Sequence, residues 1–118
     1  MKCTTATDPA TLEALIKENE AAGRKIFLFF SSDWCPDCVI ADPIVHKVVS
    51  KADCPNSIFI SCPVGDRQTY RNAGNPYRTN KKIMLRRIPT LMQWGNDQEA
   101  LVEGECASES NVRAFLCA

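Results

Sequence analysis

The chain has 118 residues, of which 45% are hydrophobic and 24% are charged, which is typical of a folded globular protein and argues against intrinsic disorder. Its 14 basic residues equal its 14 acidic residues, so the basic surplus typical of a nucleic-acid-binding protein is absent. The length predicts a single domain over residues 1–118. No apolar run approaches the length of a membrane span, and the polar first residues lack the apolar stretch of a signal peptide.

Helical and strand patterns alternate through the first half of the chain. Apolar residues at helical spacing follow a capping Asp8, and a continuous aromatic and aliphatic run follows Gly23. A second helical pattern, which contains Pro43, leads to a second apolar run. The predicted elements are a helix over 9–22, a strand over Ile26–Phe30, a helix over Pro36–Lys51 and a strand over Ser57–Cys62.

The second half begins with an irregular stretch from Pro63 to about Asn80 and ends with a hairpin and a helix. The turn signal Gly95-Asn96-Asp97 separates two short strand patterns, and Ser108 is a suitable helix cap. The predicted elements are a short helix around Pro76–Leu85, strands over Thr90–Trp94 and Glu99–Glu103, and a helix after Ser108. Alternation followed by a hairpin predicts an α/β fold, with a central mixed sheet and helices on both faces.

Seven cysteines constrain the compartment and the metal chemistry. An odd number without a signal peptide favours a reducing compartment such as the cytoplasm, where most of the thiols are expected to be free. A structural zinc site needs about four ligands, and only the CxxC pair at 35–38 has the short spacing typical of one. A zinc site completed by Cys54 and Cys62 stays open as an alternative. Regulatory disulfides are also open, because spacing assigns no partner to Cys3, Cys54 or Cys106.

The pentapeptide Trp34–Cys38 (WCPDC) carries the chemistry, because it lies where a buried strand leads into a helix. At that position Cys35 caps the helix, next to unpaired backbone amides that stabilise a thiolate. Cys38 follows three residues later on the same helix face, at a spacing compatible with a disulfide. One exposed, activated sulfur with a recessed partner is what reversible thiol–disulfide exchange requires. A stabilising or metal-binding pair is the alternative interpretation.

The WCPDC motif, the later Ile88-Pro89-Thr90-Leu91 and the strand order resemble the thioredoxin superfamily. Three further segments are similar to the narrower thioredoxin domain-containing protein 17 family, whose members have Pro-Asp between the two cysteines. These segments are Cys62–Asp66, Asn75–Asn80 and Leu101–Cys106. The resemblance covers nearly the whole chain from about residue 10, and it implies a thioredoxin fold.

The resemblance also implies a role for each matching residue. Cys35 is the expected attacking thiolate, and Cys38 is the expected resolving thiol. Pro89 matches a position that is cis in this superfamily, facing the cysteines, where the preceding backbone pairs with a substrate chain. A trans proline that merely begins an edge strand is the alternative. The expected substrate-binding residues are Trp34, Pro36, Ile88 and Pro89.

Two departures from the family pattern affect the expected mechanism. Ordinary thioredoxins have a buried aspartate six residues before the first cysteine, and here that residue is Phe29. Asp37 is the candidate replacement that assists deprotonation of Cys38, and the simpler interpretation is an acid favoured by the helix dipole. The related family usually has extra residues before its tryptophan, whereas here only 31–33 intervene, which predicts a different substrate rim.

The resemblance implies a thiol–disulfide oxidoreductase that reduces small disulfides such as cystine and selected oxidised protein cysteines. It implies no bound cofactor or metal, with electrons supplied by NADPH through thioredoxin reductase. We expect a monomer without nucleic-acid or membrane partners. Two alternatives stay open: a non-catalytic thioredoxin-fold adaptor or redox- or metal-sensing binding module, and a glutathione-dependent glutaredoxin-like enzyme, whose usual Cys-Pro-Tyr-Cys motif is absent.

Residues 66–87 form a basic segment with seven basic residues and one acid, Asp66. Arg86 and Arg87 lie close to Pro89 in the sequence. The segment therefore predicts electrostatic attraction of a partner, which is an anionic disulfide or the acidic surface of a reductase. The alternative is a solvated face without a partner.

Overall fold

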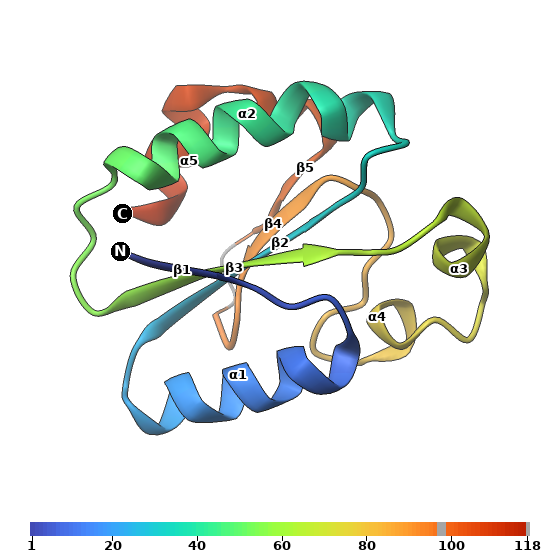
Figure 1. The fold of residues 1–118 in the computed structure, drawn as a ribbon. Coiled ribbons are helices and arrows are strands. Elements are labelled where there is room, and N and C mark those ends of the chain that lie inside the picture. Colours follow the sequence, from blue (N-terminus) through green and yellow to red (C-terminus); the bar gives the residue numbers. More distant parts are fainter. Residues whose placement is uncertain (97–98, 118) are drawn as a thin grey trace.

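The computed structural model, which describes residues 1–96 and 99–117, is organised around a five-stranded mixed sheet (Figure 1). The strand order is β1-β3-β2-β4-β5; the first three strands are parallel, and β4 and β5 run antiparallel to their neighbours. The strands are β1 (Lys2–Thr5), β2 (Lys25–Ser31), β3 (Ser57–Pro63), β4 (Thr90–Gln93) and β5 (Leu101–Val102). The helices are α1 (Pro9–Ala21), α2 (Pro36–Lys51), α3 (Arg67–Arg71), α4 (Pro76–Thr79), the 3-10 helix η1 (Glu103–Ala107) and α5 (Glu109–Leu116).

The sheet separates two hydrophobic cores. Successive side chains of a strand point to opposite faces, so Phe27 and Phe29 of β2 pack with α2 and α5, whereas Leu28 and Phe30 pack with α1. Figure 1 shows α2 and α5 on one side of the sheet and α1 on the other. The predicted mixed sheet with helices on both faces is therefore confirmed.

Local signals fix the two long helices. The Asp8 carboxylate accepts a hydrogen bond from the Thr11 backbone N–H at 2.8 Å, and Pro9 occupies the first turn of α1, where its missing N–H costs nothing. The second helix continues through Pro43 and ends at Lys51, as predicted. No helix in the described part of the chain is long and apolar enough to cross a membrane.

The ends of the chain differ most from the sequence prediction. We assigned no structure to residues 2–5, yet they form β1, an edge strand that pairs with β3 from Lys2↔Ile58 to Thr5↔Ser61. The predicted hairpin strand over Glu99–Glu103 is reduced to β5, because Glu103 has a φ of 51° and begins η1 instead. This turn allows Cys106 to reach the core.

Smaller differences between prediction and structure concern the segment between β3 and β4. The short helix predicted around Pro76–Leu85 ends at Thr79, and the stretch predicted to be irregular contains α3. In the predicted turn, Asp97 lies outside the described residues.

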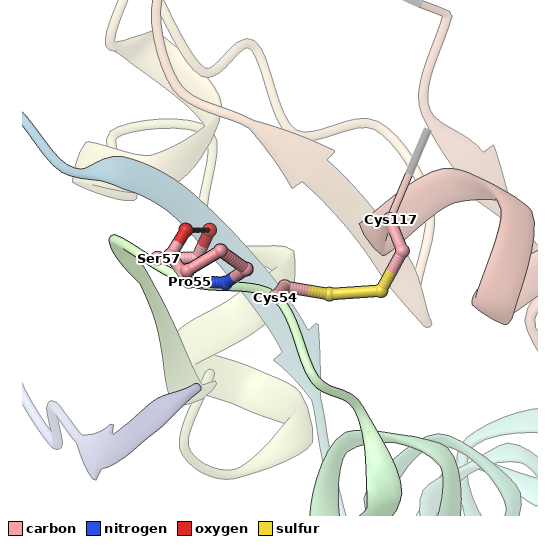
Figure 2. The surroundings of a disulfide bond; sticks show 4 residues. All are labelled: Cys54, Pro55, Ser57 and Cys117. Atoms are coloured by element: carbon pink, nitrogen blue, oxygen red, sulfur yellow. Dashed lines mark hydrogen bonds between the residues drawn. A yellow bond between two sulfur atoms is a disulfide. The ribbon is translucent and has the colours of Figure 1, made fainter.

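A disulfide joins Cys54, three residues after α2, to Cys117, directly after α5, with 5.7 Å between their Cα atoms (Figure 2). The sequence assigned no partner to Cys54, because the two cysteines lie 63 residues apart. The zinc alternative is wrong in this form, since Cys54 is bonded to Cys117 while Cys62 lies in the core on the opposite face of the sheet. The other five cysteines are free thiols, as expected for most of them: Cys3, Cys35, Cys38, Cys62 and Cys106.

Candidate functional site

The two cysteines of the WCPDC motif occupy the first turn of α2. Cys35 is the N-cap residue, with extended backbone angles (φ −93°, ψ 122°), and its side chain is half-buried. Cys38 lies one turn into the helix and is fully buried. Both thiols are free. The predicted arrangement, a partly exposed sulfur at the positive end of a helix with a recessed partner, is therefore present.

A second segment meets Cys35 from across the sheet. The Cys35 thiol lies 3.7 Å from the carbonyl oxygen of Ile88, to which it donates, although 53 residues separate the two. The Ile88–Pro89 peptide bond is cis, as expected, and Ile88 is buried two residues before β4. The fold thus brings the cysteine motif and the cis-proline segment to one place.

Burial controls the charge state of Cys38. Removal from water, together with a hydrogen bond to the Cys35 sulfur that favours the protonated thiol, raises the pKa of Cys38 to about 11. The Ser32 backbone N–H and, after it, the hydroxyls of Ser31 and Ser32 lower this pKa. Cys38 is therefore a neutral thiol at pH 7 in the reduced protein.

The residue that replaces the usual buried aspartate is sealed in the core. Phe29 is fully buried, with its ring 6.0 Å from the ring of Phe59. A carboxylate is nevertheless bonded to the end of β2: Asp42 Oδ1 accepts a hydrogen bond from Ser31 Oγ at 3.0 Å. Ser31 is buried at the end of β2, and Asp42 is half-buried on α2, one turn after Cys38.

Trp34 is held beside the cysteines by the segment that follows β3. Its indole Nε1 donates to the carbonyl oxygen of Gly65 at 2.8 Å, and Gly65 adopts a φ of 85°, which favours glycine. The Tyr70 ring packs 5.9 Å from the indole, and the Arg67 guanidinium lies 5.1 Å above it. Trp34 is therefore neither a core residue nor a freely exposed one.

Several charges of the basic segment at 66–87 are engaged within the molecule. Arg67, Arg78 and Lys82 lie over aromatic rings. Arg87 forms an ion pair with Glu103 at 3.3 Å. Arg86 is exposed near the cis-proline segment.

The remaining predicted site residues lie at the surface of the motif. Pro36 and Asp37 are both exposed in the first turn of α2, Asp37 being the acid that the helix dipole favours there. The role of Asp37 in deprotonation stays a prediction.

Two other free thiols are unsuited to exchange chemistry. Burial raises the pKa of Cys62 and that of Cys106 to about 12 each. Cys62 donates to the Ile60 carbonyl and belongs to the core, as expected. Among residues 1–96 and 99–117, the structure has no group of three or more side chains placed to hold a metal ion.

The sequence analysis assigned no role to Asp42 or to Ser31. Two signals were available. Ser31 lies two residues after Phe29 in the same strand, so both side chains point toward α2. Asp42 lies four residues after Cys38, so both occupy one face of the helix.

Comparison with known proteins agrees with this geometry. The sequence model of a family described as "Thioredoxin domain-containing protein 17-like, thioredoxin domain" matches residues 5–118. Proteins named thioredoxin domain-containing protein 17 are 39% identical over 83% of this chain and 82% of their own in Epinephelus coioides, and 37% identical over 86% and 83% in Mus musculus. A thioredoxin-like protein Clot from Arabidopsis thaliana is 34% identical over 76% of this chain and 75% of its own.

Solved structures support the same architecture. Oxidised thioredoxin O1 from Arabidopsis thaliana superimposes with a TM-score of 0.69 over all of both chains, at 13% identity. Reduced Schistosoma mansoni thioredoxin gives 0.67 over 98% of this chain and 96% of its own, at 18% identity. The expected thioredoxin fold is confirmed, and with WCPDC at the start of α2 and a cis-proline opposite, this chain belongs to the thioredoxin domain-containing protein 17-like family.

Proposed function

We propose that the protein is a thiol–disulfide oxidoreductase that reduces small disulfides such as cystine and selected oxidised protein cysteines. The observation that carries the proposal is the position of Cys35, half-buried at the helix N-terminus, 3.7 Å from the Ile88 carbonyl and three residues before buried Cys38. A disulfide that reaches Cys35 also meets the cis-proline segment. Trp34, Pro36, Ile88 and Pro89 are the proposed substrate-binding residues.

The proposed cycle has two exchange steps. The Cys35 thiolate attacks one sulfur of the substrate disulfide, which forms a mixed disulfide on Cys35 and releases the first thiolate product. Cys38 then loses its proton and attacks the Cys35 sulfur, which forms the Cys35–Cys38 disulfide and releases the second product thiolate. Two electrons and two protons restore the dithiol. We propose that NADPH supplies the electrons through thioredoxin reductase, that the protein itself binds no cofactor, and that it works as a monomer in the cytoplasm.

Two acids of α2 are candidates to assist deprotonation of Cys38. Asp37 is its neighbour in sequence and is exposed, whereas Asp42 is bonded to Ser31 on the inner side of the helix.

The test is turnover of cystine with NADPH and thioredoxin reductase, comparing the wild type with Cys35→Ser and Cys38→Ser. We expect both variants to lose turnover, and only Cys38→Ser to accumulate covalent mixed disulfides with its substrates, because its attacking sulfur is intact. Wild-type protein that neither turns over cystine nor forms mixed disulfides would instead support the adaptor alternative.

A further inference from the structure

The resolving step poses a chemical problem in this chain. Cys38 must become a thiolate to attack the mixed disulfide, yet burial raises its pKa to about 11. The buried position that holds a carboxylate in ordinary thioredoxins is occupied here by Phe29. Another group near Cys38 must therefore accept the proton if the step is to be fast at neutral pH.

Asp42 lies close to Cys38 on α2 and is bonded to a buried hydroxyl group. Ser31 Oγ donates to Asp42 Oδ1 at 3.0 Å, and Asp42 lies one turn after Cys38 on the same face of the helix. The same Ser31 hydroxyl lowers the pKa of Cys38, which is the effect of a donor near the thiolate. Ser31 is 6% exposed and Cys38 is fully buried, so bulk water has little access to the sulfur itself. A serine hydroxyl accepts one proton while it donates its own, which makes it a suitable bridge between a thiol and a carboxylate.

We propose that Asp42 is the proton acceptor for Cys38 in the resolving step and that the Ser31 hydroxyl carries the proton between them. The inference rests on the proposed exchange function. The Cys38 S–H proton moves to Ser31 Oγ, and the Ser31 proton moves to the Asp42 carboxylate. Cys38 is left as a thiolate that accepts a hydrogen bond from Ser31, and its electron pair forms the new bond to the Cys35 sulfur.

The Ser32 hydroxyl is a second buried group that can stabilise the Cys38 thiolate. Ser32 is 7% exposed, and within the described part of the chain its buried Oγ has no hydrogen-bond partner while Cys38 is a neutral thiol. The hydroxyl nevertheless lowers the pKa of Cys38, because it is placed to donate to the thiolate. A buried hydroxyl without a partner costs free energy, and that cost is recovered when the charged sulfur forms.

A surface cleft gives Asp42 a route to solvent. The cleft has a volume of about 480 Å³ and is lined by Ser31, Ser32 and Asp42, among others. The acids Asp33 and Asp66 line it as well, and His46 lies one turn further along α2. A proton that reaches Asp42 can therefore pass to water without crossing the core.

Asp37 lacks this geometry. Adjacent residues of a helix point about 100° apart, so Asp37 does not share the helix face of Cys38, whereas Asp42, four residues away, does. Asp37 is also exposed. It is therefore the competing candidate in the test: an acid directly beside Cys38 in sequence but without the bond to Ser31.

The test separates the two exchange steps with an aromatic disulfide, 5,5′-dithiobis(2-nitrobenzoate), whose thiol product is coloured. The reduced protein is mixed with this disulfide in a stopped-flow instrument. One coloured thiolate should be released when Cys35 attacks, and a second when Cys38 resolves the mixed disulfide. A Cys3→Ser background removes the exposed free thiol outside the site. The compared variants are Asp42→Asn, Asp42→Glu, Ser31→Ala and Asp37→Asn.

We expect Asp42→Asn to leave the first release unchanged and to slow the second by about tenfold or more at pH 7, because asparagine accepts the Ser31 bond but takes up no proton. Its second phase should also lose the plateau near neutral pH and rise with pH toward the pKa of Cys38, about 11. Ser31→Ala should slow the second phase, Asp42→Glu should restore it in part, and Asp37→Asn should change it less than about twofold.

Equal second phases and pH profiles in Asp42→Asn and Asp37→Asn would overturn the proposal. Equal slowing of both phases by Asp42→Asn would do so too, because it indicates a distorted site. An absent first phase in the background protein contradicts the exchange function itself, and that outcome is distinct from a defect confined to the second phase.

Discussion

Helix α2 has one cysteine pair at its N-terminus and another beyond its C-terminus, and the two pairs differ in sequence spacing and in oxidation state. At its N-terminus, Cys35 and Cys38 are three residues apart, and both are reduced. Beyond its C-terminus, Cys54 is bonded to Cys117, 63 residues away in sequence. The helix has 16 residues and is about 24 Å long at 1.5 Å per residue, so the two pairs lie far apart.

The contrast shows that placement, more than residue type, decides what a cysteine pair does. The N-terminal pair lies among unpaired helix amides, which stabilise a thiolate, and Ser31 and Ser32 lower the pKa of its buried member. The carbonyl end of the helix offers no such stabilisation to Cys54. There the bond instead ties α5, through Cys117, to the segment between α2 and β3 (Figures 1 and 2).

The largest expected effect is on turnover. Cys35→Ser should reduce cystine turnover about a thousandfold or more, because serine cannot act as the thiolate nucleophile. The double variant Cys54→Ser/Cys117→Ser should retain turnover within about twofold of the wild type. Coupled NADPH consumption measures both. A large loss of activity in the double variant would break the comparison, because it would place the distant pair in the cycle.

The free energy of unfolding should depend on the Cys54–Cys117 pair, although turnover should not. The Cys54–Cys117 bond closes a loop of 63 residues, for which the chain-entropy relation gives about 4 kcal/mol, and measured values often run lower. We expect Cys54→Ser/Cys117→Ser to lower the free energy of unfolding by about 2–4 kcal/mol in urea titrations. Cys3→Ser, which changes an exposed free thiol, is the control. A double variant as stable as this control would contradict a stabilising role for the bond.

Alkylation kinetics can sharpen the difference between the two members of the N-terminal pair. The Cys38 pKa of about 11 leaves about one thiolate per thousand molecules at pH 8. Iodoacetamide should therefore modify Cys38 at least about a hundredfold more slowly than exposed Cys3, and its rate should rise with pH up to about 11. Peptide mass spectrometry follows each site. Equal labelling of Cys38 and Cys3 at pH 8 would contradict the burial argument.

The smallest effect concerns the basic segment at 66–87. Arg86 is exposed near the cis-proline segment, and Arg87 is paired with Glu103. If these charges recruit an acidic reductase, Arg86→Glu/Arg87→Glu should lower turnover about threefold at low salt, and the difference should vanish at high salt. Lys17→Glu/Lys25→Glu, at exposed lysines on α1 and at the start of β2, is a control of equal charge change. Identical salt dependence in all three proteins would indicate a solvated face.

Local signals predicted the reactive end of α2 well. The strand-to-helix junction, the N-cap position of Cys35 and the buried position of Cys38 all follow from residues within one short segment. The cis bond before Pro89 came from the family resemblance, since local spacing left a trans proline open.

The features that sequence reasoning missed depend on distant backbone or on tertiary contact. The strand β1 has mostly exposed side chains and is stabilised by its pairing with β3, so it has no hydrophobic pattern. The bond between Cys54 and Cys117 requires α2 and α5 to be packed against the same face of the sheet. The contact of Ser31 with Asp42 joins a strand end to a helix face, and its two residues look unremarkable when read singly.

The Cys54–Cys117 bond also determines whether the fragments separate after proteolytic cleavage. The closed loop from 54 to 117 contains the cis-proline segment and excludes both Cys35 and Cys38. A protease that nicks the exposed turns around α3 therefore produces two fragments, which share the active site between them and stay covalently joined. Adding a reductant removes that link, so gel mobility of the nicked protein distinguishes the oxidised from the reduced form.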